Sequence, residues 1–198
     1  MVPSKQLLIS EDAKAVLKKA KELLAERSAN NVTFNDVIVE FVGKAVRLME
    51  LPADIKTYIG AFAGIVSKYP DTKGIILFGS VARGTYGKDS DIDVMVVVDK
   101  EKIKNYEIAT DAEMQVEGLR APFLERGLHL RLSITVLQAD ELKAMRPIYF
   151  DLLRDGIILY EKEYAMTDFL IDIRSVWHKR VFTSKGEILR WKEKQATR

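Results

Sequence analysis

Residues 78–94 read Phe78-Gly-Ser-Val-Ala-Arg-Gly-Thr-Tyr-Gly-Lys-Asp-Ser-Asp-Ile-Asp-Val94, and this stretch carries the polar residues with the clearest chemical meaning. The apolar run Gly74–Phe78 leads into it and predicts a buried strand by its length and its β-branched residues. Asp91–Val98, polar at its start and apolar later, predicts a second strand. Small, glycine-rich residues connect the two. The pattern therefore predicts a strand, a tight turn that opens a helix, and a return strand.

The turn after the first strand has the composition of an anion site. Gly79 has no Cβ, so a phosphate group can approach its backbone. Ser80 supplies a hydroxyl group and opens the predicted helix, whose first N–H groups and positive dipole end favour an anion. Arg83 adds a fixed positive charge nearby. We expect these residues to contact phosphate groups.

Asp91 and Asp93 lie two residues apart at the start of the second strand. Because side chains alternate along a strand, both carboxylates face the same side, with Cα atoms roughly 6–7 Å apart. Two ionised carboxylates this close repel each other unless a cation lies between them. Mg²⁺ is the first candidate, since it prefers carboxylates together with substrate phosphates. A phosphate cradle facing such a pair is typical of phosphoryl or nucleotidyl transfer.

The composition of the whole chain excludes several classes of protein and of functional site. Its 198 residues are 47% hydrophobic and 30% charged, which is typical of a globular chain that needs no disulfide bonds. The absence of cysteine excludes a cysteine nucleophile and cysteine-ligated metals, and two histidines leave little room for a multi-histidine metal site. The net charge of +2 does not indicate nucleic-acid binding by the chain as a whole.

The location of the protein is also predicted from its apolar runs. No run approaches the roughly 20 residues that span a bilayer. No signal-peptide core precedes Glu11 and Asp12. We therefore expect a cytoplasmic protein that has no contact with a membrane.

Helices and strands are expected along the rest of the chain as well. Apolar residues at helical spacing or in alternating runs predict helices at Ile55–Tyr69, Glu101–Arg126 and Met166–Val176 and strands at His129–Leu137 and Gly156–Tyr160. Helices dominate the first part and strands mixed with helices the remainder. This order predicts an α+β fold with an α-helical N-terminal extension.

Gly79-Ser80 followed by Asp91-x-Asp93 on the next strand resembles the motif of the nucleotidyltransferase superfamily typified by DNA polymerase beta and the antibiotic-modifying nucleotidyltransferases. The small prokaryotic members are the most similar, because they share the sequences Ala-Arg-Gly and Asp-Ser-Asp-Ile-Asp. The resemblance covers about residues 70–162, and Arg146–Glu161 resembles the segment that closes the domain in small members. It implies a small mixed β-sheet flanked by helices, with residues 53–162 as the nucleotidyltransferase domain.

The resemblance also implies roles for individual residues. It implies a nucleotide site formed by Gly79, Ser80, Arg83 and Ser90. Asp91 and Asp93 would be catalytic residues that coordinate two Mg²⁺ ions bridging the α-phosphate and the leaving pyrophosphate. The donor substrate would be a nucleoside triphosphate, with ATP expected first.

One position departs from the family pattern. Active members carry a third carboxylate on the following strand, where it activates the attacking hydroxyl, whereas this chain has Ser133 there. Serine is a poor metal ligand and no base. Three explanations remain open. Another acid, Asp151 first, reaches the site as a catalytic residue; the metal alone promotes deprotonation; or the chain binds nucleotide and transfers nothing.

The acceptor is predicted from the resemblance alone. Small members often serve as the antitoxin of a toxin–antitoxin pair and nucleotidylate the partner toxin, so a protein acceptor is expected first. A small molecule, as in aminoglycoside modification, is second, and a nucleic acid such as a tRNA end is third. The rival class is a non-enzymatic regulator that binds nucleotide or DNA.

The sequence at each end of the chain predicts an accessory region outside the nucleotidyltransferase domain. Residues 1–52 resemble the ribbon–helix–helix fold of prokaryotic regulators. Two features of this segment favour dimerisation over DNA binding: Leu8 lies on the side that would face the DNA groove, and eight basic residues are balanced by seven acidic ones. A homodimer is therefore expected, with a plain helical extension as the other alternative. Residues 163–198 predict a basic helical tail that faces either solvent or a phosphate-bearing partner such as RNA.

Overall fold

The computed structural model describes Lys18 and residues 43–100, 102–144, 146–175, 178–183 and 186–191. Most of the ribbon–helix–helix region predicted at residues 1–52 lies outside these ranges, so that prediction stays untested. Among the described residues, no helix is long and apolar enough to cross a membrane.

The elements follow one another in mixed order. The described helices are α3 (Gly43–Glu50), α4 (Ala53–Val66), α5 (Gly79–Arg83), α6 (Lys102–Val116), α7 (Ala121–Glu125), α8 (Ile148–Asp155) and α9 (Ala165–Ser175), with 3-10 turns η2 (Glu117–Arg120) and η3 (Ala139–Lys143). The described strands are β1 (Thr72–Phe78), β2 (Asp91–Val98), β3 (Arg131–Gln138), β4 (Ile157–Glu161), β5 (His178–Thr183) and β6 (Gly186–Trp191).

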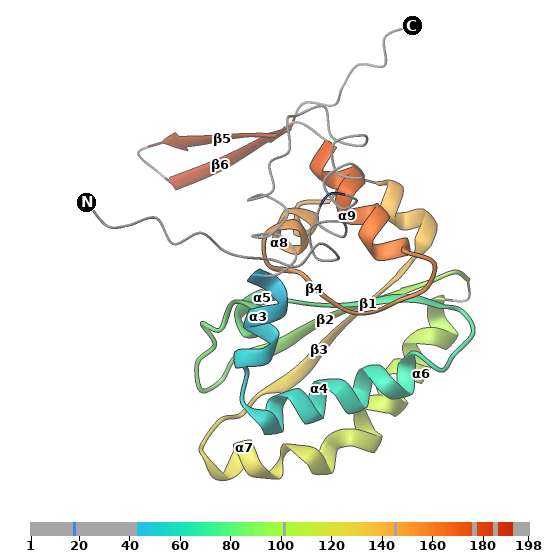
Figure 1. The fold of residues 1–198 in the computed structure, drawn as a ribbon, viewed down its shortest axis with the longest axis vertical. Coiled ribbons are helices and arrows are strands. Elements are labelled where there is room, and N and C mark those ends of the chain that lie inside the picture. Colours follow the sequence, from blue (N-terminus) through green and yellow to red (C-terminus); the bar gives the residue numbers. More distant parts are fainter. Residues whose placement is uncertain are drawn as a thin grey trace, which may run out of the picture.

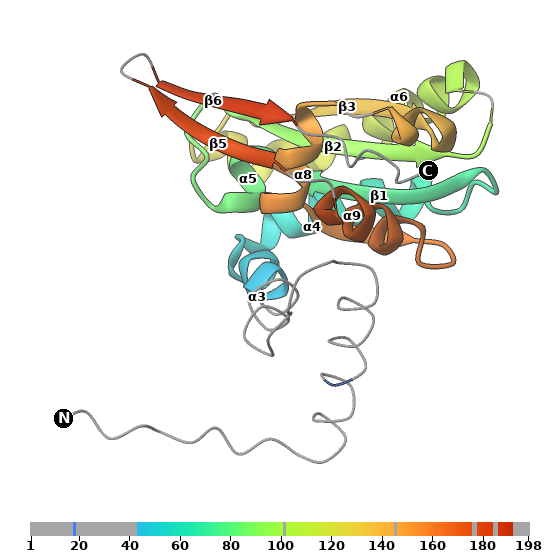
Figure 2. The ribbon, with the colours of Figure 1, turned by 90° about the horizontal axis from the view of Figure 1, so that it is seen from above.

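The first four strands form one mixed sheet in the order β3-β2-β1-β4. β1 is antiparallel to β2 and to β4, whereas β2 and β3 run parallel. Figure 2 shows β1, β2 and β3 side by side, with α5 at one end of them. The two central strands are buried along most of their length, which explains why both are apolar runs. The predicted α+β fold, a small mixed sheet flanked by helices, is confirmed.

Helices cover both faces of this sheet (Figure 1). One core cluster packs α4, α6 and α7 on the sheet through side chains such as Phe62 and Phe123. A second cluster packs α8 and α9 on the opposite face. Val94 of β2 belongs to the first cluster and Met95 to the second, because successive side chains alternate. Asp93, two residues before Met95, therefore lies on the α8–α9 face.

The prediction of a basic helical tail at residues 163–198 is wrong for the second half of this segment. α9 ends at Ser175, and β5 and β6 form an antiparallel pair from His178↔Trp191 to Thr183↔Gly186. Runs of β-branched, aromatic and other apolar residues, Val181-Phe-Thr183 and Ile188-Leu189, favour strands, and a high count of basic residues does not distinguish a helix from a strand.

Two other segments are divided more finely than the sequence predicts. The long helix expected at Glu101–Arg126 ends at Val116 and gives way to η2 and α7, where Gly118 and Pro122 disfavour a continuous helix. In the closing segment, only β4 is a strand, and the residues before it form α8.

Tyr149 links the helices on one face of the sheet, and its hydroxyl and its ring make separate contacts. The hydroxyl donates to the carbonyl oxygen of Glu141 at 3.1 Å, and the ring packs edge-on against Phe169 with centroids 5.0 Å apart. We expect Tyr149→Phe to lower the free energy of unfolding by about 1 kcal/mol through the lost hydrogen bond. Tyr149→Ala should cost about 3–5 kcal/mol, because the ring is fully buried. Urea unfolding of the two variants measures both values, and equal losses would contradict this division.

Candidate active site

Gly79 and Asp93 are in contact at one end of the sheet. Phe78, the last residue of β1, pairs with Asp93 of β2, so Gly79 comes directly beside the carboxylate. A Cβ built on Gly79 would lie 2.0 Å from Oδ2 of Asp93, and the φ of +75° at Gly79 is one that other residues rarely adopt. Only glycine fits here, for both reasons.

The glycine turn opens directly into α5. The first amide groups of a helix lack partners within the helix and are available to an anion. Gly79 and Ser80 occupy these positions, and both are partly exposed. Gly84 ends α5 in the left-handed conformation, and Thr85 N–H donates to the Ser80 carbonyl at 2.9 Å. This short helix holds the expected phosphate-binding residues at the same end of the sheet as the carboxylates.

Asp91 and Asp93 are joined on their face of the sheet by two residues of β3. In the parallel register Asp91 pairs with Arg131 and Asp93 pairs with Ser133. Ser133 thus occupies the strand position beside Asp93 where a third carboxylate was expected. Asp91 and Arg131 are exposed, whereas Asp93 and Ser133 are partly buried.

Burial and a neighbouring charge act on Asp93. Burial raises the pKa of its carboxyl above the usual value, the charge of Asp91 raises it further, and Arg83 acts in the opposite direction. Ionisation of Asp93 is therefore less favourable than that of a solvent-exposed aspartate. A positive ion beside both carboxylates would relieve this repulsion.

The oxygen donors at this position suit a hard cation. Two carboxylates fit Mg²⁺, which commonly keeps several waters and takes further ligands from substrate phosphates. Among the described residues there is no group of three or more His, Cys, Asp or Glu side chains that could hold a metal alone. Asp91 and Asp93 would hold the ion, and the remaining ligands would come from water and substrate.

The remaining predicted site residues have partners of their own. Arg83 donates through Nη1 to Oδ2 of Asp155 at 2.7 Å. Ser90 accepts a hydrogen bond from Gly87 N–H at 2.8 Å and so closes the loop before β2. Asp151 accepts from Nη2 of Arg154 at 2.9 Å, and its side chain is half exposed. The roles assigned to these three residues in nucleotide binding or catalysis stay predictions.

Sequence reasoning missed Asp155. Its side chain is only 6% exposed, and it binds both Arg83 and Arg154. Burial acts to raise its pKa, but hydrogen bonds from Arg154 and Arg83 outweigh burial and hold the pKa below the usual value. The available signal was an Asp between the apolar residues Leu152-Leu153 and Ile157-Ile158, where an unpaired charge would be costly.

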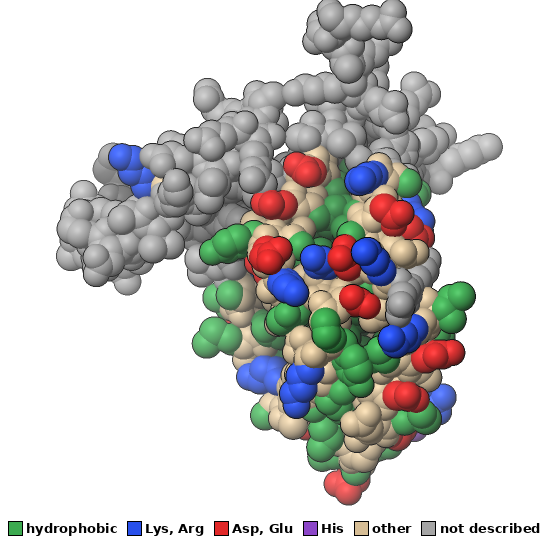
Figure 3. All heavy atoms as spheres, turned by 90° about the vertical axis from the view of Figure 1, so that its right-hand side faces the viewer, with side chains coloured by type: hydrophobic (Ala, Val, Ile, Leu, Met, Phe, Trp, Pro, Cys, Tyr) green, Lys and Arg blue, Asp and Glu red, His purple; other side chains and the backbone are tan. Residues whose placement is uncertain are grey.

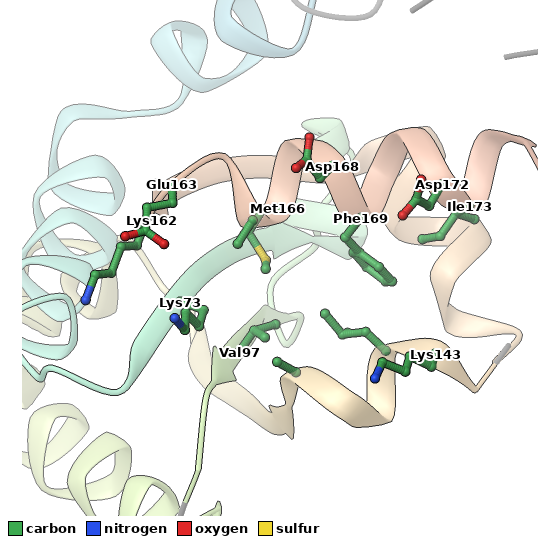
Figure 4. A pocket seen from close by; sticks show the side chains of 13 residues that line it. Lys73, Val97, Lys143, Lys162, Glu163, Met166, Asp168, Phe169, Asp172 and Ile173 are labelled. Atoms are coloured by element: carbon green, nitrogen blue, oxygen red, sulfur yellow. The ribbon is translucent and has the colours of Figure 1, made fainter. Parts of the chain in front are cut away.

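A cavity lies on the same face but at the opposite end of the strands. Figure 4 shows Met166 and Phe169 of α9 above Val97, with Lys73 and Lys143 on its lower side. Its volume is about 460 Å³. Val97 is near the end of β2, whereas Asp91 is its first residue, so this cavity is separate from the carboxylate pair.

Basic and acidic side chains are mixed on the face of the molecule shown in Figure 3. Among the described residues of this face, positively and negatively charged side chains are interspersed. Such a mixture is typical of an exposed protein surface and differs from the basic stripe that nucleic-acid binders present.

Comparison with known proteins identifies a family. The nucleotidyltransferase domain family matches residues 59–163, a range that includes the glycine turn, both carboxylates and α8. A comparison with curated proteins finds no match.

Several solved structures share part of the chain's architecture. A toxin–antitoxin with AMP-PNP is 17% identical, with 63% of this chain and 84% of that chain covered and a TM-score of 0.39. The toxin–antitoxin MntA-HepT is 16% identical, with coverage of 60% and 79% and a TM-score of 0.34. A tri-AMPylated Shewanella oneidensis HEPN toxin in complex with MNT antitoxin is 15% identical, with coverage of 67% and 82% and a TM-score of 0.30. Likenesses of this degree say nothing of substrate or partner.

Gly79→Ala tests the contact between the turn and the carboxylate. The new methyl group would collide with Asp93 and would force a strained backbone, so we expect a loss of at least about 1 kcal/mol in the free energy of unfolding. Gly60→Ala in α4 is a matched control, because no atom beyond its chain neighbours and the backbone of its own helix lies within 4 Å of its Cβ position. We expect this control to be neutral or more stable by up to about 1 kcal/mol. Equal stability of Gly79→Ala and the wild type would refute the contact.

Asp93→Asn tests the repulsion within the carboxylate pair. Without metal, the variant should melt at a higher temperature than the wild type, because a partly buried charge beside Asp91 is removed. Added Mg²⁺ should raise the melting temperature of the wild type and leave that of the variant unchanged. Asp99→Asn, which changes an exposed acid just beyond the other end of β2, should keep the wild-type response. A Mg²⁺ response retained by Asp93→Asn would exclude Asp93 as a ligand.

Proposed function

The chain belongs to the nucleotidyltransferase domain family, and on this premise we propose that it moves a nucleoside monophosphate from a nucleoside triphosphate to a hydroxyl group of an acceptor. The observation that supports the proposal is the contact of Gly79 with Asp93, which brings the glycine turn and the carboxylate pair to one end of the sheet. ATP is the first expected donor. A cytoplasmic location and a homodimer, both expected from the sequence, stay predictions.

The chain's own residues would act in three ways. The backbone N–H groups of Gly79 and Ser80, with the Ser80 hydroxyl, would bind the triphosphate at the start of α5. Arg83 would offset its negative charge, and Ser90 would hold the loop beside it. Asp91 and Asp93 would hold two Mg²⁺ ions. When bound, the ions would supply charge neutralisation on the phosphates and would lower the pKa of the attacking hydroxyl.

The transfer breaks a phosphoanhydride bond of the triphosphate and forms a phosphodiester bond to the acceptor. The acceptor oxygen bonds to the α-phosphorus, the bond from that phosphorus to the oxygen bridging toward the β-phosphate breaks, and pyrophosphate leaves. The hydroxyl proton needs an acceptor, and Ser133 cannot serve as one. We keep Asp151 as the proposed base. It is half exposed, and it would have to exchange its hydrogen bond with Arg154 for one with the acceptor hydroxyl.

A protein acceptor is proposed first, specifically the toxin of a toxin–antitoxin pair, with a small molecule second and a tRNA end third. This order rests on the resemblance to small family members described above.

A second candidate function is nucleotide binding without transfer. The pairing of Ser133 with Asp93 favours it, because the strand position next to the carboxylate pair offers no base. Ser133→Asp tests the missing carboxylate: a gain in transfer would indicate that the third carboxylate limits the reaction. No change, together with intact nucleotide binding, would favour a different base or a binding function.

Transfer of a radioactive α-phosphate from ATP is the direct test. The protein is incubated with Mg²⁺ and extract of the source organism, in parallel with the other three triphosphates. We expect a labelled product that disappears with the Asp91→Asn, Asp93→Asn double variant, and its size identifies the class of acceptor. Absence of label, while the wild type still binds nucleotide with Mg²⁺, would reject transfer and favour the binding function.

A further inference from the structure

Arg83 is hydrogen-bonded to a buried acid outside the carboxylate pair. It is the last residue of α5, and its side chain is 37% exposed. Its Nη1 donates to Oδ2 of Asp155 at 2.7 Å, and its charge also acts on Asp93. A guanidinium group has five donors, so this bond leaves others free for a phosphate.

Asp155 has a fixed position in the fold. It is the last residue of α8, and β4 begins two residues later. Ile157 of β4 pairs with Leu77 of β1, just before the glycine turn. The carboxylate that binds Arg83 is therefore attached to the strand that carries Gly79. Both partners of the hydrogen bond are anchored to β1, one at the end of α5 and the other through β4.

A second arginine holds the carboxylate of Asp155 in place. Nε of Arg154 donates to Oδ1 at 3.0 Å and to Oδ2 at 3.1 Å, and Nη2 donates to Oδ2 at 2.8 Å. These bonds fix the orientation of the carboxyl plane and help to keep it ionised in a buried position. Oδ2 therefore meets Arg83 in a set geometry, whereas an unrestrained arginine side chain loses rotamer entropy when a ligand orders it.

We propose that Asp155 is a positioning residue that holds the guanidinium group of Arg83 beside the Gly79–Ser80 turn before the nucleotide binds, so that its remaining donors meet the triphosphate. The proposal rests on the proposed function, since it names Arg83 as a phosphate ligand. Asp155 itself contacts neither substrate nor metal. It acts by lowering the entropic cost at which Arg83 binds an anion.

A double-mutant cycle on the full chain tests the proposal. The dissociation constant of ATP with Mg²⁺ is measured by calorimetry for the wild type, Asp155→Asn, Arg83→Gln and the double variant. We expect Asp155→Asn to weaken binding about tenfold, the worth of one charge-assisted hydrogen bond. The double variant should bind as Arg83→Gln does, because Asp155 acts only through Arg83. A purely structural role would instead lower the affinity again in the Arg83→Gln background and would overturn the proposal.

Asp54→Asn is the matched control. It also breaks an ion pair between an Asp and an Arg 72 residues away, but its partner is Arg126 and neither residue is part of the site. We expect unchanged ATP affinity from this variant. If it weakens binding as much as Asp155→Asn does, general loosening of the fold explains the effect and the proposal fails.

Asp155→Glu keeps the test decisive if Asp155→Asn does not fold. It retains the charge for Arg83 and Arg154 but moves the carboxylate by one methylene group. We expect a folded protein that binds ATP more weakly than the wild type and no more weakly than Arg83→Gln. Wild-type affinity in this variant would overturn the proposal while leaving the proposed function intact. If the wild type bound none of the four triphosphates, the proposed function itself would be rejected, and this inference with it.

Discussion

The contact between the Gly79 backbone and the Asp93 carboxylate is the constraint on which the site depends. Any larger residue at Gly79 would occupy the position of a carboxylate oxygen. The absence of a side chain there brings the end of β1, the first amide groups of α5 and the start of β2 together at one end of the sheet. The other site residues are arranged around this contact, and the register of β2 with β3 then places Ser133 beside the carboxylates.

The central strands and the carboxylate pair could be predicted from sequence because each rests on local information. β1 and β2 are apolar runs buried on both faces, and the alternation of side chains in a strand suffices to put Asp91 and Asp93 on one face. The family resemblance placed Ser133 where active members carry a third carboxylate, and the pairing of Ser133 with Asp93 is what the structure adds.

The parts that sequence reasoning missed depend on contacts distant along the chain. α8 is a short segment that was taken together with the strand after it, and the β5–β6 pair was hidden by its many basic residues. The bond between Arg83 and Asp155 joins residues 72 positions apart, and no local spacing indicates it. These features follow from tertiary packing, which overrides local propensity in short elements.

The strand order also fixes when this site can form during synthesis of the chain. The glycine turn and both carboxylates are made early, but α8 and β4 come some 60 residues after them, and β4 must still reach the central strand β1. A growing chain therefore carries the glycine turn and the carboxylate pair well before it has the buried acid that pairs with Arg83. Completion of the site coincides with closure of the sheet, so a partly made or partly unfolded chain should lack an ordered Arg83 even where its carboxylates are already paired with β3.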